Sequence, residues 1–150
     1  MKKMKYLLVF VCSYGLAQIQ TLQSSPSAKI EQVVGLTNVT IDYSRPAKRD
    51  RKIMGELVPM GEIWRAGANE NSTLSFSDPV KVGGKNLDAG TYSLFIRPGK
   101  SMWEVFFYTE TDNWGLPEKW NTESIAVVVE TEIIQLKNTI ESFTISLEDL

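Results

Sequence analysis

The residues with the clearest chemical potential lie in one irregular stretch, which runs from Arg51 to Asn71. Within it, Arg65 carries a guanidinium group, which can hold a carboxylate, phosphate or sulfate through two parallel hydrogen bonds. Asn69 and Glu70 begin an amide–carboxylate–amide run, which can bond sugar hydroxyls or ligate calcium through oxygen atoms. The alternative is structural: Arg65 ties the loop to the fold, and Asn69 occupies a turn. Arg65, Asn69 and Glu70 are therefore candidate ligand-binding residues, with both interpretations open.

A second candidate site lies in the polar segment 109–122, which contains Trp114 and Trp120. Acidic and amide residues neighbour both tryptophans, and exposed aromatic rings beside polar groups commonly stack on sugar rings. The alternative is that both indoles fold back over the edge of the protein. We expect a ligand site where the Arg51–Asn71 stretch approaches this loop, with Trp114 and Trp120 as candidate binding residues.

Histidine is absent from the sequence, and this absence excludes several chemistries. The chain cannot build a Ser-His-Asp triad, a Cys-His dyad or an HExxH zinc site. Catalysis would have to use carboxylates, Lys, Tyr, Ser or an oxygen-ligated metal. No spacing selects a pair of carboxylates for glycoside hydrolysis among Glu56, Glu62, Glu70 and Glu118. We predict a protein that is not an enzyme and that has no metal or cofactor, with a carboxylate-based hydrolase as the minor alternative.

Positive charge is concentrated on one loop of an acidic protein. Arg45, Lys48, Arg49, Arg51 and Lys52 lie within eight positions, whereas the formal net charge of the whole chain is −2. These cations either meet an anionic ligand or keep the loop solvated. The acidic net charge disfavours nucleic acid and anionic lipid as partners bound through the overall field.

The first residues have the layout of a secretory signal peptide. Three lysines among the first five residues precede a short apolar run, and Ala17 ends a small-x-small cleavage site. The apolar run is too short to span a membrane. The alternative is lipid attachment at Cys12, but residues 9–11 lack the small side chains that such processing prefers. Cleavage after Ala17 leaves 133 of the 150 residues, with no cysteine, and we expect a secreted or periplasmic protein.

The remaining sequence reads as short strands that must position the candidate residues. Residues 18–27 are predicted to be a flexible leader and residues 28–150 a single domain. Apolar side chains alternate with polar ones, as in Val39, Ile41 and Tyr43, which is the period of a strand. The predicted strands are 29–34, 38–43, 73–77, 80–82, 85–87, 91–97, 102–108, 124–131 and 139–147.

Eight or nine short strands with turns between them predict an all-β, antiparallel β-sandwich, either jelly-roll-like or immunoglobulin-like. Segment 102–108 is apolar on both faces, which is typical of a central strand or of a strand whose outer face meets a loop. Gly83 and Gly84 favour a tight hairpin turn. Because Leu150 follows an alternating segment with no polar tail, we expect the sandwich to lack one final strand.

Three sequence blocks together resemble one bacterial family. They are SP-x-A-x-I-x-Q-x-VG-x-T-x-V-x-I-x-YSRP at 25–46, R-x-I-x-G-x-LVP-x-G-x-IWR-x-GAN at 51–69 and GK-x-L-x-AGTYSLF at 84–95. This pattern is similar to the domain of unknown function 2911, found in secreted proteins chiefly of the Bacteroidetes. The resemblance implies compartment and domain identity but no activity, and members usually continue into a further strand that carries a tryptophan. The sequence departs from the family pattern at Asp50 (usually glycine), Met60 (usually aromatic) and Ala66 (usually threonine).

Together these features predict a secreted or periplasmic β-sandwich that binds a polar ligand, such as a glycan or a cell-envelope component. The alternative function is a structural or interaction domain of the envelope with no small-molecule ligand. The predicted ligand-binding residues are Arg65, Asn69, Glu70, Trp114 and Trp120.

Overall fold

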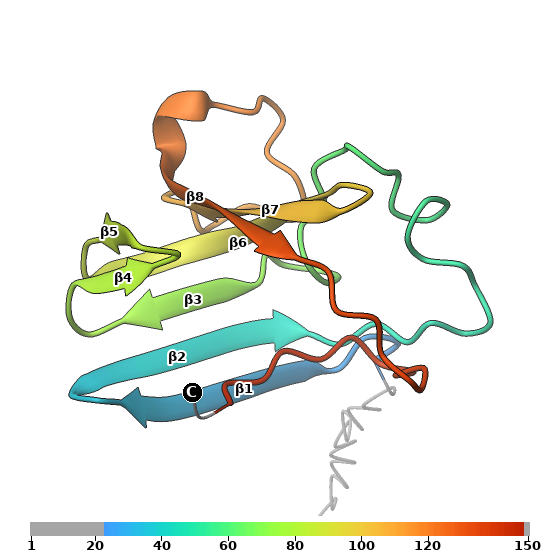
Figure 1. Ribbon diagram of the computed structural model, residues 1–150, viewed down its shortest axis with the longest axis horizontal. Helices are drawn as coiled ribbons and strands as arrows, with labels where there is room; N and C mark the ends of the chain where they lie inside the picture. Colours follow the sequence, from blue (N-terminus) through green and yellow to red (C-terminus); the bar gives the residue numbers. More distant parts are fainter. Residues whose placement is uncertain (1–22, 149–150) are drawn as a thin grey trace, which may run out of the picture.

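The computed structural model describes residues 23–148, which form an all-β protein (Figure 1). The predicted signal peptide and the first part of the predicted leader lie outside these residues. One turn of 3₁₀ helix, Thr122–Ser124, precedes the last strand. The strands are β1 (Ser27–Val34), β2 (Thr37–Ser44), β3 (Thr73–Phe76), β4 (Val80–Val82), β5 (Lys85–Leu87), β6 (Gly90–Pro98), β7 (Met102–Tyr108) and β8 (Ile125–Glu132).

Six of these strands form one antiparallel sheet in the order β1-β2-β3-β6-β7-β8, and β4 pairs with β5 in a small second sheet. This arrangement confirms the predicted all-β antiparallel class and is consistent with a sandwich. No helix among the described residues is long and apolar enough to cross a membrane.

The first face of the large sheet carries the alternating apolar residues. Register places Ile41 opposite Leu74 and Leu94 opposite Phe107, so their side chains lie on one side. Two separate segments cover this face. The β4–β5 hairpin lies over the β6–β8 half (Figure 1), where Leu87 packs against it. Phe143 of the C-terminal segment packs against β2. The hairpin turn uses the two glycines as predicted, because Gly83 and Gly84 both have positive φ angles of 55° and 78°.

The second face of the sheet is also apolar around β7. Phe106 and Tyr108 of β7 and Phe95 of β6 are buried there. The loop between β7 and β8 folds over them and inserts Trp120. This confirms the prediction that β7 is apolar on both faces, since it is a central strand with a loop against its outer side.

The predicted strand at 139–147 is wrong as a strand, although its alternation is real. Phe143, Ile145 and Leu147 pack on the β1–β2 half of the sheet, in the core cluster of Val39, Ile41 and Tyr43. The segment lies on the face of the sheet rather than at its edge, so its backbone cannot form a ladder there. It is held by isolated contacts, including the Phe143 amide donating to the Pro46 carbonyl at 2.9 Å.

The last residues of the predicted leader belong to the ordered fold. The Pro26 carbonyl accepts a hydrogen bond from the Arg45 amide at 2.9 Å, and β1 begins at Ser27. The Ser25 carbonyl accepts from the side-chain amide of Asn69 at 3.2 Å. The segment just before β1 is thus fastened to both β2 and the central stretch.

Candidate functional site

The central stretch is fixed to the sheet at Trp64. The amide of Trp64 donates to the Ile96 carbonyl at 2.7 Å, and the Ile96 amide returns the bond at 2.8 Å. The Trp64 ring meets the Phe143 ring edge-on, with centroids 5.3 Å apart. The following residue, Arg65, extends to the β7–β8 loop, where a Cβ atom built on Gly115 would lie 3.2 Å from its Nη1.

Residues 46–58 form a loop that closes on itself through its own hydrogen bonds. Arg51 donates from Nε to the Lys48 carbonyl at 2.9 Å and from Nη2 to the Ala47 carbonyl at 2.7 Å. Arg49 and Asp50 adopt left-handed φ angles of 49° and 58°. Aspartate tolerates this conformation better than most residues, although the family resemblance predicts glycine at position 50. The two hydrogen bonds of Arg51 hold its guanidinium in a defined position.

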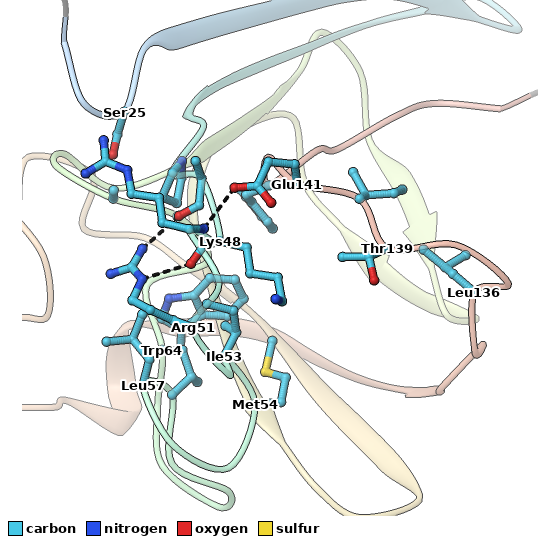
Figure 2. A pocket seen from close by; sticks show the side chains of 18 of the residues that line it. Ser25, Lys48, Arg51, Ile53, Met54, Leu57, Trp64, Leu136, Thr139 and Glu141 are labelled. Atoms are coloured by element: carbon cyan, nitrogen blue, oxygen red, sulfur yellow. Dashed lines mark hydrogen bonds between the residues drawn. The ribbon is translucent and has the colours of Figure 1, made fainter.

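The C-terminal segment forms the wall that faces this loop. The Lys48 amide donates to the Glu141 carbonyl at 2.7 Å, and the Arg49 amide donates to Oε1 of the same glutamate at 2.8 Å. Between the two walls lies a cleft of about 880 Å³. Figure 2 shows Arg51, Trp64 and Ile53 on one side of it and Leu136 and Glu141 on the other.

The cleft combines an apolar interior with a cationic rim. Glu141 is the only carboxylate among the described residues that line it. A ligand in this space would therefore meet hydrophobic surface and positive charge together. The apolar lining includes Ile53, Met54, Leu57, Val58, Trp64, Leu136, Ile140 and Phe143, and the cationic lining consists of Lys48, Arg49, Arg51, Arg65 and Lys137.

Arg65 differs from the other cations of the cleft because, among the described residues, it alone of them has a buried side-chain donor without a hydrogen-bond partner. Its Nε atom is buried with no hydrogen-bond partner, and its guanidinium forms no ion pair within residues 23–148. Buried charges in proteins are normally paired or hydrogen-bonded, because desolvation without compensation is costly. Arg65 therefore presents an unsatisfied donor and an uncompensated charge beside the cleft.

Asn69 and Glu70, the other two predicted site residues of the central stretch, do not line the cleft. Asn69 has a left-handed φ of 59°, and its Nδ2 donates to the Ser25 carbonyl and to Oγ of Ser44 at 3.3 Å. These contacts give its amide a structural use, as its turn-forming character allows. Glu70 is exposed to solvent. Of the five predicted residues, Arg65 alone lines the cleft.

The two predicted tryptophans have opposite environments. Trp120 stacks on Tyr108 with ring centroids 4.8 Å apart and meets Phe95 edge-on at 5.3 Å. Trp120 is thus partly buried against the apolar cluster of the second face. Trp114 is 70 % exposed. The predicted approach between the central stretch and this loop does occur, at Arg65 and Gly115, but it brings only one exposed indole with it.

The sequence interpretation missed the C-terminal wall of the cleft. Leu136, Lys137 and Glu141 were not candidates, because nothing in their local sequence indicates that they face residues 46–58. The cationic loop gave a usable signal, since its charges are dense for an acidic protein. Within the described part of the chain, no group of three His, Cys, Asp or Glu residues is placed to hold a metal ion.

The structure defines an antiparallel β protein with a cationic, apolar-floored cleft beside its central loop. The chain belongs to a family of proteins of unknown function, DUF2911, whose model matches residues 25–150. Neither the comparison with curated proteins nor that with solved structures finds a match.

Proposed function

We propose that this protein is a non-enzymatic binding module whose cleft holds an amphiphilic anion, an apolar molecule joined to a carboxylate or phosphate group. The observation that carries the proposal is Arg65, a half-buried guanidinium with an unpartnered Nε beside the cleft. An anionic group bound there would supply the missing counter-charge and a hydrogen-bond acceptor. The ligand would then gain the charge-assisted bond without first breaking a pre-existing ion pair.

The rim of the cleft supports the same ligand class. Arg51 donates two hydrogen bonds to backbone carbonyls, and these bonds fix its charged guanidinium at the rim. Arg49 is held through its amide by Glu141, and Lys137 approaches from the C-terminal wall. Several cations around one concave surface raise the local concentration of an anionic ligand. The apolar interior then accommodates the rest of the molecule.

The composition of the cleft favours binding over hydrolysis. Hydrolysis by paired carboxylates needs two such groups on either side of the scissile bond. The described lining of the cleft provides only Glu141, and one of its oxygens already accepts a hydrogen bond from the Arg49 amide. The absence of histidine from the sequence removes the usual alternative base. We propose that the module acts outside the cytoplasm after signal-peptide cleavage, where a component of the cell envelope would be an available ligand.

Calorimetric titration with three ligands that share one alkyl chain tests the proposal. Decanoate and decyl phosphate carry an anion, whereas decanol does not. We expect both anions to bind at least about ten-fold more tightly than decanol, with affinity falling as salt is raised. Lys100→Met, at an exposed turn away from the cleft lining, is the matched control for Arg65→Met. Equal affinity for decanol, or no binding of either anion up to millimolar concentration, would overturn the proposal.

A glycan ligand at Trp114 is the second candidate, because that indole is exposed and adjoins Gly115, which lies against Arg65. Its test is quenching of tryptophan fluorescence by soluble glycans in wild type and in Trp114→Phe. Quenching that persists unchanged in Trp114→Phe excludes this site. If neither amphiphile nor glycan binds, the remaining function is that of an interaction domain without a small-molecule ligand.

A further inference from the structure

The outer edge of β1 carries a self-complementary pattern that is independent of the cleft. β1 is the first strand in the order of the large sheet, and within residues 23–148 it pairs only with β2. It is eight residues long, contains no proline and shows no bulge in its register with β2. A long, regular edge strand of this kind is a template for pairing with another strand.

Hydrogen bonds of the neighbouring residues show which residues of β1 direct their backbone groups toward β2 and which direct them outward. Because the Arg45 amide bonds the Pro26 carbonyl, the even-numbered residues of the strand direct their backbone groups toward β2. Asn38 gives an independent check. It lies opposite Val33, yet its carbonyl bonds the Ser77 amide on the β3 side, so this pair does not bond across β1 and β2. The outward backbone groups of β1 belong to Ser27, Lys29, Glu31 and Val33.

Two of these outward residues carry opposite charges on the same face. Nζ of Lys29 lies 2.6 Å from Oε1 of Glu31, and the two side chains are 55 % and 65 % exposed. A lone lysine on an edge strand discourages pairing with other strands. Here the lysine has a carboxylate beside it. An incoming strand whose charges run in the opposite order would therefore place an opposite charge beside both residues.

We propose that β1 pairs antiparallel with β1 of a second copy of this chain, extending the sheet across a two-fold axis at Ile30. Lys29 then lies opposite Glu31 of the partner subunit, and Glu31 opposite the partner's Lys29. Ser27 lies opposite Val33 of the partner subunit, so all four outward residues form backbone pairs. Cross-strand pairs of opposite charge stabilise such a ladder.

The charges of the strand select this register over its neighbours. Only outward residues can form hydrogen bonds across this edge. The register can therefore slip only by two residues at a time, because such a slip keeps outward residues opposite one another. A slip in one direction places Lys29 opposite the partner's Lys29. A slip in the other places Glu31 opposite the partner's Glu31. Like charges directly opposite one another destabilise a sheet, and each slip also leaves an outward residue without a partner.

The opposite edge of the sheet is less open. Nζ of Lys85, from the β4–β5 hairpin, donates to the Val128 carbonyl of β8 at 2.7 Å. The pairing of β7 with β8 also contains a register shift between Phe107 and Tyr108. A bulge and a covering group are the devices by which proteins blunt sheet edges. The inference therefore concerns β1 alone.

Sedimentation velocity of the purified protein over a wide concentration range tests this dimer. We expect a reversible monomer–dimer equilibrium for the wild type. Lys29→Glu and Glu31→Lys should each weaken dimerisation at least about ten-fold, since each places like charges opposite one another. The double variant, Lys29→Glu with Glu31→Lys, restores opposite charges and should dimerise like the wild type. Lys100→Glu makes the same charge change elsewhere and should have no effect.

A backbone variant separates strand pairing from general charge effects. Glu31→Pro removes an outward N–H group but no hydrogen bond to β2, so it should keep the monomer folded and abolish the dimer. Circular dichroism and melting temperature verify folding in each case. A wild type that stays monomeric throughout, single charge variants that dimerise like the wild type, or a double variant that stays monomeric would overturn the proposal. The Lys29→Glu variant should retain wild-type affinity for decanoate, because β1 does not line the cleft.

Discussion

Lys48 and Glu141 are joined across the cleft, with the amide nitrogen of Lys48 donating to the carbonyl oxygen of Glu141 at 2.7 Å. The neighbouring Arg49 amide donates a hydrogen bond to the carboxylate of the same glutamate, which lies 92 positions later in the sequence. The cleft therefore exists only because the C-terminal segment folds back onto the central loop. Any change that releases this segment should open the cleft as well as destabilise the protein.

Phe143 is the side chain that anchors the C-terminal wall. It meets Tyr43 and Trp64 edge-on, with ring centroids 5.8 Å and 5.3 Å apart. We predict that Phe143→Ala lowers the free energy of unfolding by about 2–3 kcal/mol, less than for a fully buried phenylalanine because Phe143 is half-buried. Urea denaturation measures this loss, and Leu36→Ala, at a side chain 95 % exposed, is the control. Equal effects of the two changes would mean that the wall is not anchored there.

Trp120 and Trp114 should respond very differently to truncation. Trp120 contacts three buried aromatic rings, so Trp120→Ala is expected to cost about 3–5 kcal/mol of stability. Trp114→Ala should change stability by less than about 0.5 kcal/mol, as is usual for exposed positions. Guanidinium denaturation of both variants makes the comparison. A larger loss for Trp114 than for Trp120 would contradict the packing of this loop.

The hairpin glycines give a matched pair of stability variants. A Cβ atom on Gly84 would meet nothing within 4 Å, so Gly84→Ala should cost only the strain of its φ angle, about 1–2 kcal/mol. A Cβ atom on Gly83 would in addition clash with Cγ1 of Val129. We therefore predict that Gly83→Ala destabilises the protein by about 1–3 kcal/mol more than Gly84→Ala. The added Val129→Ala change should relieve most of this difference, and no relief would argue against the close approach.

The Arg97–Glu104 pair predicts a pH dependence of stability. The hydrogen bond from Arg97 lowers the pKa of the Glu104 carboxyl below its ordinary value of 4.5. A lowered folded-state pKa stabilises the protein above pH 4.5, and this stabilisation disappears as pH falls below that value. The effect is modest because the two side chains are 41 % and 32 % exposed. Urea midpoints measured against pH should decline less steeply in Glu104→Gln than in wild type, and identical slopes would contradict the assignment.

The strands were predictable because alternation records burial directly. The β4–β5 hairpin and β7 match their predicted bounds, and the faces formed by Val39, Ile41 and Tyr43 are those observed. The same signal failed at 139–147 for a physical reason. Alternation reports which side chains are buried, not whether the backbone has a neighbouring strand. A segment lying on the face of a sheet gives the same pattern as a strand within it.

The site was less predictable, because its parts meet only in three dimensions. Arg65 was a candidate from its residue type, but its lack of a partner depends on packing with the β7–β8 loop. The sequence did not distinguish Trp114 from Trp120, since both lie in one polar segment and only tertiary contacts bury the second. The left-handed backbone of Asn69 and its bond to Ser25 were not predictable either, because neither is visible in a local sequence pattern.

The most direct test of the central claim is to compare decanoate affinity and melting temperature in wild type and Arg65→Met. Because Nε of Arg65 has no hydrogen-bond partner and its guanidinium forms no ion pair within the described residues, its replacement by an apolar side chain of similar length leaves no carboxylate unpaired. We predict that the affinity falls at least about ten-fold while the melting temperature changes by less than about 2 °C. A fall of about 10 °C or more with unchanged affinity would instead make Arg65 a structural residue and contradict the proposed anion site.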